Sequence, residues 1–291
     1  MVVGMIAAII LSAGFGSRLR PLTDEVPKPL VPVGDAPSVL HIERALAAAG
    51  CSRIVVNTHH RPEAFRGVPF APGTALVHEA TLLGTAGGVQ NARDALGPGP
   101  VLVWNGDILA SIDVPALLAA AAPDLDAVWM VARRPRGEGT VGLDGSGRVV
   151  RVRGFRGGDE ASGGDFLGIS WLSEATVRGL PREGCLIGDV LGPALQRGAR
   201  IGSATHDGPW DDLGSPASYL EANLRWLRDR ERNVYLGASA VAPPGTTGVL
   251  GRGAILRGAP GRDVVLWPGA EASSLPPRSI VTTAGRIVTV P

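Results

Sequence analysis

Met5-Ile-Ala-Ala-Ile-Ile-Leu11 runs directly into Ser12-Ala-Gly-Phe-Gly-Ser-Arg-Leu19, and this junction decides the fold. The first stretch is a continuous apolar run of strand length, which is typical of a strand covered on both faces. The second stretch is rich in small residues, so backbone N–H groups can approach phosphate oxygens where a strand turns into a helix. We therefore predict a buried first strand followed by a phosphate-binding loop.

Two familiar phosphate-binding motifs do not fit this loop. The dinucleotide pattern G-x-G-x-x-G needs a third glycine where the chain has Leu19, and the G-K-[ST] of a P-loop does not occur in the sequence. The cations lie close behind instead, since Arg18 and Arg20 follow the glycines and Lys28 stands between two prolines. Lys28 is the only lysine of the chain. A compact ammonium and a forked guanidinium are not equivalent at a phosphate, so we expect Lys28 to occupy a position that needs an ammonium.

Strand and helix signals alternate from the start of the chain to about residue 230. We expect a helix over Ser38–Ala49, a strand over Arg53–Asn57, a helix over Thr85–Leu96, strands over Val101–Trp104 and Ala127–Ala132, a helix opened by Asp113 and Pro115, a hairpin of Thr140–Leu143 with Val149–Arg153, and a helix from Ser215-Pro216. This alternation predicts an α/β fold with a doubly wound, mostly parallel, Rossmann-like sheet.

The composition changes after Arg232. From there on, short apolar pairs alternate with Gly and Pro, and Leu236-Gly237, Leu250-Gly251 and Val264–Ala270 suggest rungs of a left-handed β-helix. A plain β-extension or an irregular packing arm also fits this degenerate repeat. We therefore divide the chain into a first domain, residues 1–232, and a β-rich, β-helix-like extension, residues 233–291. The open end of such an extension could join copies of the chain, or the extension could fold back on its own first domain.

Composition narrows the partners and the compartment. The chain has 291 residues and a formal charge of +1, which gives no reason to expect nucleic acid or an acidic membrane as a partner. Cys51 and Cys185 are too few and too far apart for a disulfide framework, so we expect a cytoplasmic protein.

The loop and the lysine resemble the signature of the sugar-1-phosphate nucleotidyltransferases, most closely the mannose-1-phosphate guanylyltransferases. The resemblance continues, in order, at Leu83-Gly-Thr-Ala-Gly-Gly88, at Asn105-Gly-Asp107 and at Trp210-Asp-Asp-Leu-Gly-Ser215. It implies that residues 1–232 form a catalytic domain that joins a nucleoside triphosphate (NTP) to a sugar 1-phosphate and releases pyrophosphate. The attacking phosphate oxygen is already anionic, so fixed cations and a metal ion would carry this catalysis.

The resemblance also implies roles for single residues. The nucleotide-binding set would be Leu11, Ala13, Gly14, Gly16, Ser17, Glu79, Gly84, Thr85 and Ala86. Arg18 would neutralise the leaving end of the triphosphate, and Lys28 would lie between the reacting phosphates. Glu79 would face the base edge, where a carboxylate accepts from the paired donors of guanine; a solvated charge at a strand end is an equal alternative.

Two carboxylates are expected to hold Mg²⁺. Asp107 follows a predicted strand at its carboxyl end, where α/β sheets bind ligands, and Mg²⁺ prefers one or two carboxylates with phosphate oxygens and water. The second should be Asp212, aligned on the Trp-x-Asp-x-Gly-[Ser/Thr] pattern, because alternation along an extended segment turns the adjacent Asp211 to the other face.

The sugar side departs from the family pattern. Many relatives have a second lysine after the central hairpin that grips the sugar phosphate, and this chain has none to offer; Arg151 or Arg153 could substitute, or either could be an exposed hairpin charge. The segments similar to the sugar pocket of relatives contain Asn105, Gly142, Asp165 and Gly168. His59-His60 is expected to be a loop or cap pair rather than a metal site, because adjacent residues on a strand point to opposite faces.

The sequence thus predicts a Mg²⁺-dependent enzyme acting on GTP and mannose 1-phosphate. Within the same enzyme class, uridylyl or thymidylyl transfer to glucose 1-phosphate or N-acetylmuramate 1-phosphate is the alternative. From another class, a non-catalytic regulatory or scaffold relative is the competitor, although such proteins can lose the loop cations and metal carboxylates that this chain keeps.

Overall fold

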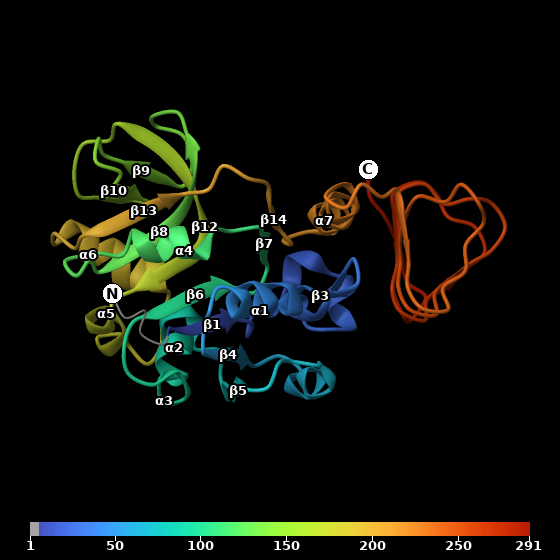
Figure 1. Ribbon diagram of the computed structural model, residues 1–291, viewed down its shortest axis with the longest axis horizontal. Helices are drawn as coiled ribbons and strands as arrows, with labels where there is room; N and C mark the ends of the chain where they lie inside the picture. The colour runs from blue at the N-terminus through green and yellow to red at the C-terminus, as the bar shows by residue number, and fades with distance from the viewer. Residues whose placement is uncertain (1–5) are drawn as a thin grey trace. The chain divides into compact units, whose positions relative to one another are not determined.

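The computed structural model describes residues 6–291 (Figure 1). The chain forms two compact units, and each combines stretches far apart in the sequence. The first contains the described residues up to Gly14 together with Ile42–Pro209, and the second contains Phe15–His41 together with Trp210–Pro291. Met5, the first residue of the predicted N-terminal strand, lies outside the described residues.

One large sheet organises the first unit. Its parallel part has the order β6-β1-β4-β5, with bounds β1 Ala7–Leu11, β4 Arg53–Thr58, β5 Thr74–His78 and β6 Val101–Asn105. Leu11 lies opposite Asn57 on one side and Asn105 on the other, so the carboxyl ends of these strands meet at one edge. The predicted buried first strand is confirmed, because Ala8, Ile9 and Ile10 have no exposed surface.

The rest of this sheet is antiparallel for the most part, which corrects the expectation of a mostly parallel sheet. β12 runs antiparallel to β6, β8 and β9, the β9–β10 hairpin follows, and only β13 pairs in parallel, with β8. The bounds are β8 Ala127–Arg134, β9 Val141–Leu143, β10 Val149–Val152, β11 Phe155–Arg156, β12 Ser162–Leu172 and β13 Ile201–Thr205. The strand–helix alternation therefore holds for one half of the sheet, and the other half is built from neighbouring hairpins.

The helices of the first unit are short. α2 (Gly84–Asn91) and α3 (Arg93–Leu96) break at Ala92 the single helix predicted over Thr85–Leu96. Asp113 accepts a hydrogen bond from the backbone of Ala116 and caps the predicted helix that follows it. The other bounds are α1 Ser38–Ala48, which runs across the division between the units, the 3-10 helix η4 Pro62–Gly67, strand β7 Ile108–Ala110, α4 Val114–Ala119, α5 Glu174–Arg178, the π-helix η5 Leu186–Leu191 and α6 Gly192–Gln196.

The second unit contains a compact run of turns from the N-terminal part of the chain and the α7 helix from its C-terminal part. Its bounds are the 3-10 helices η1 Ser17–Leu19, η2 Leu22–Asp24 and η3 Lys28–Leu30, strands β2 Pro32–Val33, β3 Ala36–Pro37 and β14 Trp210–Asp212, and helix α7 Pro216–Arg228. Ser215 and Ser218 form a capping box at the start of α7, as the Ser-Pro pair predicts. Tyr219 of α7 donates to the carbonyl of Pro32 at 2.6 Å, which ties the helix to the N-terminal run.

Stacked coils follow α7 in the second unit. β15, β16, β18 and β20 pair in parallel, so that Leu236, Leu250 and Leu266 lie in one row. Figure 1 shows these orange-to-red segments as a series of coils with a three-sided outline. The bounds are β15 Val234–Leu236, β16 Gly248–Leu250, β17 Ile255–Leu256, β18 Val264–Leu266, β19 Glu271–Ala272, β20 Ser279–Val281 and the antiparallel β21 Ile287–Thr289.

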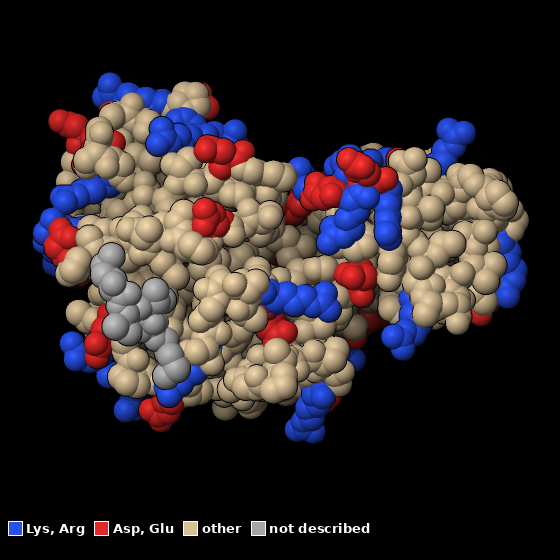
Figure 2. All heavy atoms as spheres, in the orientation of Figure 1, with Lys and Arg blue, Asp and Glu red and all other residues tan. Residues whose placement is uncertain are grey.

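The surface shows no field of one sign on the face seen in Figure 2, where cationic and anionic side chains are interspersed. Within residues 6–291, no helix combines the length and the apolar character that crossing a membrane requires.

Candidate active site

The end of β1 forms the start of the predicted phosphate loop. The backbone N–H of Ser12 donates to Oδ1 of Asn57 at 2.6 Å, and Ala13 is buried. Gly14 is exposed, with open space where a side chain would be. The carbonyl of Leu11 accepts from the backbone N–H of Gly106 at 2.9 Å, which joins the loop to the Asn105–Asp107 turn. Leu11, Ala13 and Gly14 thus belong to the first unit, next to the turn that carries Asp107.

The second half of the loop packs against the lysine segment in the second unit. Gly16 has a φ of 64°, and a Cβ there would lie 2.8 Å from Cγ2 of Thr23 and 2.9 Å from Cβ of Lys28. The hydroxyl of Thr23 donates to the carbonyl of Gly16 at 2.9 Å. Only glycine suits this left-handed, crowded position. Ser17 and Arg18 follow it in η1, and both are exposed.

Lys28 and Asp212 come together within the second unit. Lys28 lies in η3 with its side chain 11% exposed, and its Nζ is 3.8 Å from Oδ1 of Asp212. This Oδ1 is itself buried and lacks a hydrogen-bond partner among the described residues. A buried carboxylate oxygen without a donor suits a cation, so Asp212 fits the role of a metal ligand.

Asp211 contacts a different partner from Asp212, in keeping with the alternation of side chains along an extended segment. Arg225 of α7 donates through Nε to both of its carboxylate oxygens, at 3.1 and 3.0 Å. Burial raises the pKa of Asp211 and outweighs the lowering effect of Arg225. Asp211 therefore anchors β14 to α7.

Asn105 and Asp107 lie at the carboxyl end of β6. Gly168, with a φ of 70°, faces the side-chain amide of Asn105 so closely that a Cβ would collide with it. Two of the predicted sugar-side residues are therefore in contact. Asp107 is half-buried in the first unit. Over residues 6–291, no three His, Cys, Asp or Glu side chains are grouped as a protein-only metal site, so a metal held here would need ligands from the substrate.

The predicted nucleoside loop is held from one side by a segment that sequence reasoning missed. The backbone N–H of Ala86 donates to the carbonyl of Gly184 at 2.9 Å, and that of Leu186 donates to the hydroxyl of Thr85 at 2.7 Å. A Cβ on Gly84 would lie 2.5 Å from the carbonyl oxygen of Gly184. No residue type marks Gly184–Leu186 as functional, because its contribution comes from backbone groups.

Glu79 is not the solvated charge that was one of the two expectations, because it is 1% exposed. Its Oε1 accepts from Nδ2 of Asn57 at 2.6 Å, and its Oε2 accepts from the backbone N–H of Leu83 at 3.1 Å. Both oxygens thus have donors within the protein. His59 and His60 follow β4 in a loop, as expected, and Nδ1 of His59 lies 2.9 Å from the carbonyl of Glu79.

The hairpin arginine nearest the predicted sugar pocket is already engaged. Arg151 and Glu160 form a largely buried pair, 2.7 Å between Nε and Oε2, and Arg151 also donates to the carbonyls of Glu138, Gly139 and Val141. The bond from Arg151 lowers the pKa of Glu160 to about 2. Arg151 is therefore engaged with the hairpin itself, and its part in place of the second family lysine stays a prediction. Arg153, with a φ of 52°, stays exposed.

The remaining sugar-side residues lie on the same hairpin and on β12. Gly142 faces Glu160 at a distance that leaves no room for a side chain. Asp165 pairs with Arg134, 2.7 Å between Nε and Oδ2, and Arg134 is half-exposed. A cation of β8 thus stands beside Asp165.

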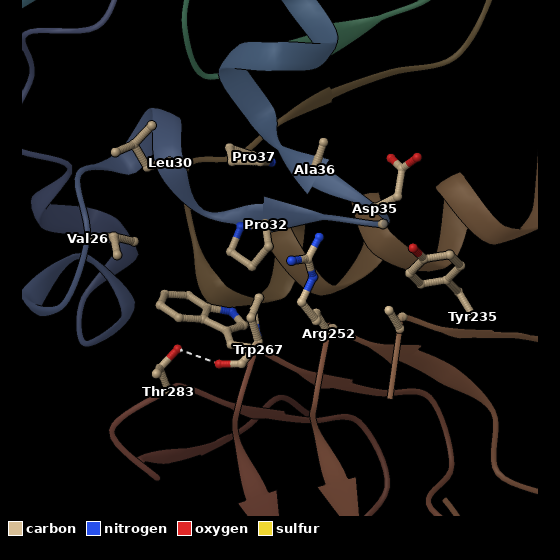
Figure 3. A pocket seen from close by; sticks show the side chains of 15 residues that line it. Val26, Leu30, Pro32, Asp35, Ala36, Pro37, Tyr235, Arg252, Trp267 and Thr283 are labelled. Carbon is tan, nitrogen blue, oxygen red and sulfur yellow. Dashed lines mark hydrogen bonds between the residues drawn. The ribbon is translucent and has the colours of Figure 1, made fainter. Parts of the chain in front are cut away.

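A separate cavity of about 440 Å³ lies within the second unit. Val26 and Leu30, on either side of Lys28, form one wall, and Trp267 and Arg252 of the coils form another (Figure 3). In Figure 3 the guanidinium of Arg252 points toward Pro32 and Asp35. None of the site residues predicted from the sequence lines this cavity.

Comparison with known proteins places this arrangement in a family. Residues 7–229 match the sequence model of the family described as nucleotidyl transferase. The mannose-1-phosphate guanylyltransferase of Mycobacterium tuberculosis is 34% identical, over 52% of this chain and 44% of its own length. The mannose-1-phosphate guanyltransferase of Schizosaccharomyces pombe is 31% identical, over 76% of this chain and 64% of its own length. The N-acetylmuramate alpha-1-phosphate uridylyltransferase of Neisseria meningitidis is 32% identical, over 74% and 96%.

A solved structure supports the same fold. HddC from Yersinia pseudotuberculosis, complexed with GMP-PN, superposes with a TM-score of 0.64 at 21% identity, over 76% of this chain and all of that one. The chain spans less than two thirds of the two guanylyltransferases, at 44% and 64% of their lengths. The mixed sheet and its helices fit the family's α/β core, and the chain belongs to the nucleotidyl transferase family, among relatives that are sugar-1-phosphate nucleotidyltransferases.

Proposed function

We propose that the protein transfers a nucleotidyl group from an NTP to a sugar 1-phosphate, giving an NDP-sugar and pyrophosphate. The observation that carries the proposal is the 3.8 Å approach of the Lys28 ammonium to a buried, otherwise unpartnered oxygen of Asp212. A fixed ammonium beside a carboxylate that lacks a donor suits a reaction in which phosphates and a divalent ion meet. Gly16 packs on Lys28 and so links the phosphate loop to this pair.

Each group has a defined task in this reaction. The backbone from Ala13 to Ser17 would bind the triphosphate, and Arg18 would neutralise the pyrophosphate that leaves. Lys28 would lower the repulsion between the two reacting phosphates. Asp107 and Asp212 would hold Mg²⁺, which supplies positive charge to phosphate oxygens when bound. The attacking oxygen needs no general base, because it is ionised at neutral pH.

GTP with mannose 1-phosphate is the preferred pair of substrates. This choice is supported by the guanylyltransferases among the relatives. The second candidate is uridylyl transfer, because the chain spans 96% of the N-acetylmuramate alpha-1-phosphate uridylyltransferase. Thymidylyl transfer to glucose 1-phosphate belongs to the same alternative.

Pyrophosphate release tests the assignment. The protein would be incubated with Mg²⁺ and each of GTP, UTP, dTTP, ATP and CTP, against mannose, glucose and N-acetylmuramate 1-phosphates. We expect the highest kcat/KM with GTP and mannose 1-phosphate. Turnover of UTP or dTTP but not of GTP would reject the guanylyl preference. If no pair of NTP and sugar phosphate releases pyrophosphate, the non-catalytic scaffold is favoured.

We further propose that the coils from residue 233 onward are a left-handed β-helix-like extension of a catalytic domain of residues 1–232. The parallel rows of β15, β16, β18 and β20 support a helical stack, and β15 leaves an edge through which copies of the chain could associate. Native mass spectrometry of the full chain should then give a homo-oligomer, and a monomer would reject this role for the edge. We place the protein in the cytoplasm, in keeping with its two free thiols, Cys51 and Cys185.

A further inference from the structure

Three neighbouring strand ends in the first unit are connected by buried side chains. Ser12 follows β1, Asn57 lies in β4, and Glu79 follows β5. The backbone N–H of Ser12 donates to Oδ1 of Asn57 at 2.6 Å, and Nδ2 of Asn57 donates to Oε1 of Glu79 at 2.6 Å. The backbone N–H of Leu83 donates to Oε2 of Glu79 at 3.1 Å. We refer to the hydrogen bonds from Ser12 through Asn57 and Glu79 to Leu83 as the polar relay.

The polar relay has a fixed direction. The side-chain oxygen of Asn57 must face Ser12 and its nitrogen must face Glu79, because flipping the amide would set N–H against N–H and oxygen against carboxylate. Asn57 is 2% exposed and Glu79 is 1% exposed, so water cannot readily replace a lost partner. A Cβ on Gly88 of α2 would lie 2.7 Å from Nδ2 of Asn57 and 2.8 Å from Oε1 of Glu79. The helix therefore closes tightly over the relay.

The two ends of the polar relay are the beginnings of the two nucleotide loops. Ser12 leads into Ala13 and Gly14, which we assign to the triphosphate. Leu83 leads into Gly84–Ala86, which we assign to the nucleoside. A triphosphate and its nucleoside are covalently joined, so the distance between these loops must match the nucleotide.

We propose that Asn57 and Glu79 are positioning residues that fix the triphosphate loop relative to the nucleoside loop. This inference rests on the proposed function and changes the role of Glu79. Its carboxylate acts on Leu83 from behind the loop and does not read the base edge. Disrupting the polar relay should therefore raise the KM of every NTP by the same factor and should leave the KM of the sugar phosphate unchanged.

Isosteric variants test the direction of the relay. Asn57→Asp keeps the acceptor for Ser12 but sets a carboxylate against Glu79. Glu79→Gln offers Asn57 and Leu83 one acceptor oxygen where two are needed. We expect each single variant to raise KM for all NTPs at least 10-fold by the same factor, with an unchanged KM for sugar 1-phosphate.

Combining the two substitutions should restore the relay. In the double variant, the new carboxylate at position 57 would accept from the backbone of Ser12 and from the new amide group at position 79. The amide oxygen at position 79 would then accept from the backbone of Leu83, so every donor again meets an acceptor. The NTP KM should return to within about threefold of wild type, which is the non-additive outcome expected of directly bonded partners.

Glu43→Leu is the control for general destabilisation, because it removes the single carboxylate oxygen that accepts both hydrogen bonds made to Glu43. Glu43 is 3% exposed and accepts from the backbone of Ala71 at 2.8 Å and from the hydroxyl of Thr74 at 2.5 Å, but it touches neither loop. This variant should lose thermal stability with an unchanged NTP KM. If it raises the NTP KM as Glu79→Gln does, general destabilisation explains the effect and the proposal fails.

Three further results would overturn the positioning role. They are a wild-type NTP KM in Asn57→Asp, a double variant no better than the single ones, and a change of base preference in Glu79→Gln, which would return Glu79 to the base edge. NTP binding measured by calorimetry separates this proposal from the proposed function. A wild-type protein that binds NTP without turnover would reject the function and leave the comparison of variants intact, whereas one that binds no NTP rejects both.

Discussion

Lys28 is held by contacts on its stem as well as by its charge. Gly16 lies against its Cβ, its Nζ faces Asp212, and prolines stand on both sides of it. Lys28→Arg keeps the charge and changes its shape, so we expect kcat to fall on the order of 100-fold, the effect of misplacing a reacting group by about 1 Å. Circular dichroism and thermal unfolding should stay as in wild type. Wild-type turnover in this variant would contradict the role of Lys28.

Asp211 and Asp212 are neighbours with opposite expected effects. Asp212→Asn should lower Mg²⁺-dependent turnover on the order of 100-fold with little loss of stability, because its Oδ1 has no donor to lose. Asp211→Ala should lower the free energy of unfolding by roughly 1–3 kcal/mol, because it removes both oxygens that accept from Arg225, and should leave kcat near wild type. Kinetics and urea unfolding of both variants check this, and an exchange of the two outcomes would reverse the metal assignment.

Glu160 should make the stability of the first unit depend on pH. The bond from Arg151 lowers its folded-state pKa to about 2, so the unfolded chain takes up its proton at higher pH. The stabilisation is complete above the ordinary glutamate range and is lost as pH falls toward 2. When the pH falls from 7 to 3, the free energy of unfolding of the wild type should drop by about 2 kcal/mol more than that of Glu160→Gln. Urea unfolding at both values measures this, and equal losses would contradict it.

At the residue scale, the sequence predicted groups whose chemistry is rare and missed groups whose role depends on distant partners. Lys28 stood out as the only lysine, and the alternation argument separated Asp212 from Asp211. Arg151 looked available because nothing in the sequence shows that Glu160 and three carbonyls surround it. Asn57 gave no signal for the same reason, since its partners Ser12 and Glu79 lie far from it along the chain.

At the scale of elements, the start of α2 depends on the segment packed against it. Gly84 has a φ of 74°, and a Cβ added there would lie 2.5 Å from the carbonyl oxygen of Gly184, whereas Gly73 has a φ of 96° and open space. Gly84→Ala therefore adds crowding to backbone strain, and Gly73→Ala adds strain alone. We expect Gly84→Ala to lower the free energy of unfolding by about 1–3 kcal/mol more than Gly73→Ala does. Gly84→Ala should also raise the NTP KM. Urea unfolding and steady-state kinetics of both variants measure these effects. Equal effects would show that crowding at Gly184 is unimportant.

The elements that could be predicted were those with a simple apolar pattern. The parallel strands β1, β4 and β6 are buried on both faces and read as continuous apolar runs. β12 could not be predicted, because Gly163, Gly164 and Gly168 weaken the strand signal of its sequence. In the structure, a register shift between Phe166 and Ser170 also interrupts its pairing. The antiparallel half of the sheet, and with it the mixed topology, therefore could not be inferred from the strand–helix alternation.

At the scale of the whole molecule, the second unit joins both halves of the sequence. Glu25 accepts from the hydroxyl of Thr282 and, at 3.1 Å, from the backbone N–H of Ala284. Trp267 donates to Tyr219 at 2.9 Å, and Tyr219 donates to Pro32. The coils thus support the segment that carries Lys28.

Removing residues 233–291 should therefore loosen the Lys28 segment selectively. We expect faster hydrogen exchange over residues 20–40 and in α7, with unchanged protection in β1, β4 and β6, which belong to the core of the first unit. Exchange measured by mass spectrometry on the full and shortened chains tests this. Unchanged protection over residues 20–40 would show that the coils are dispensable for this segment.

The bond between Glu25 and Thr282 joins residues 257 positions apart, and this has a consequence for biosynthesis. A ribosome delivers the amino end first, so the turns around Lys28 emerge long before the residues that will brace them. A nascent chain halted before Thr282 leaves the exit tunnel should fold its large sheet while its ammonium-bearing turns wait unbraced. Catalytic competence would then arrive only after the coil that carries Thr282 has been translated.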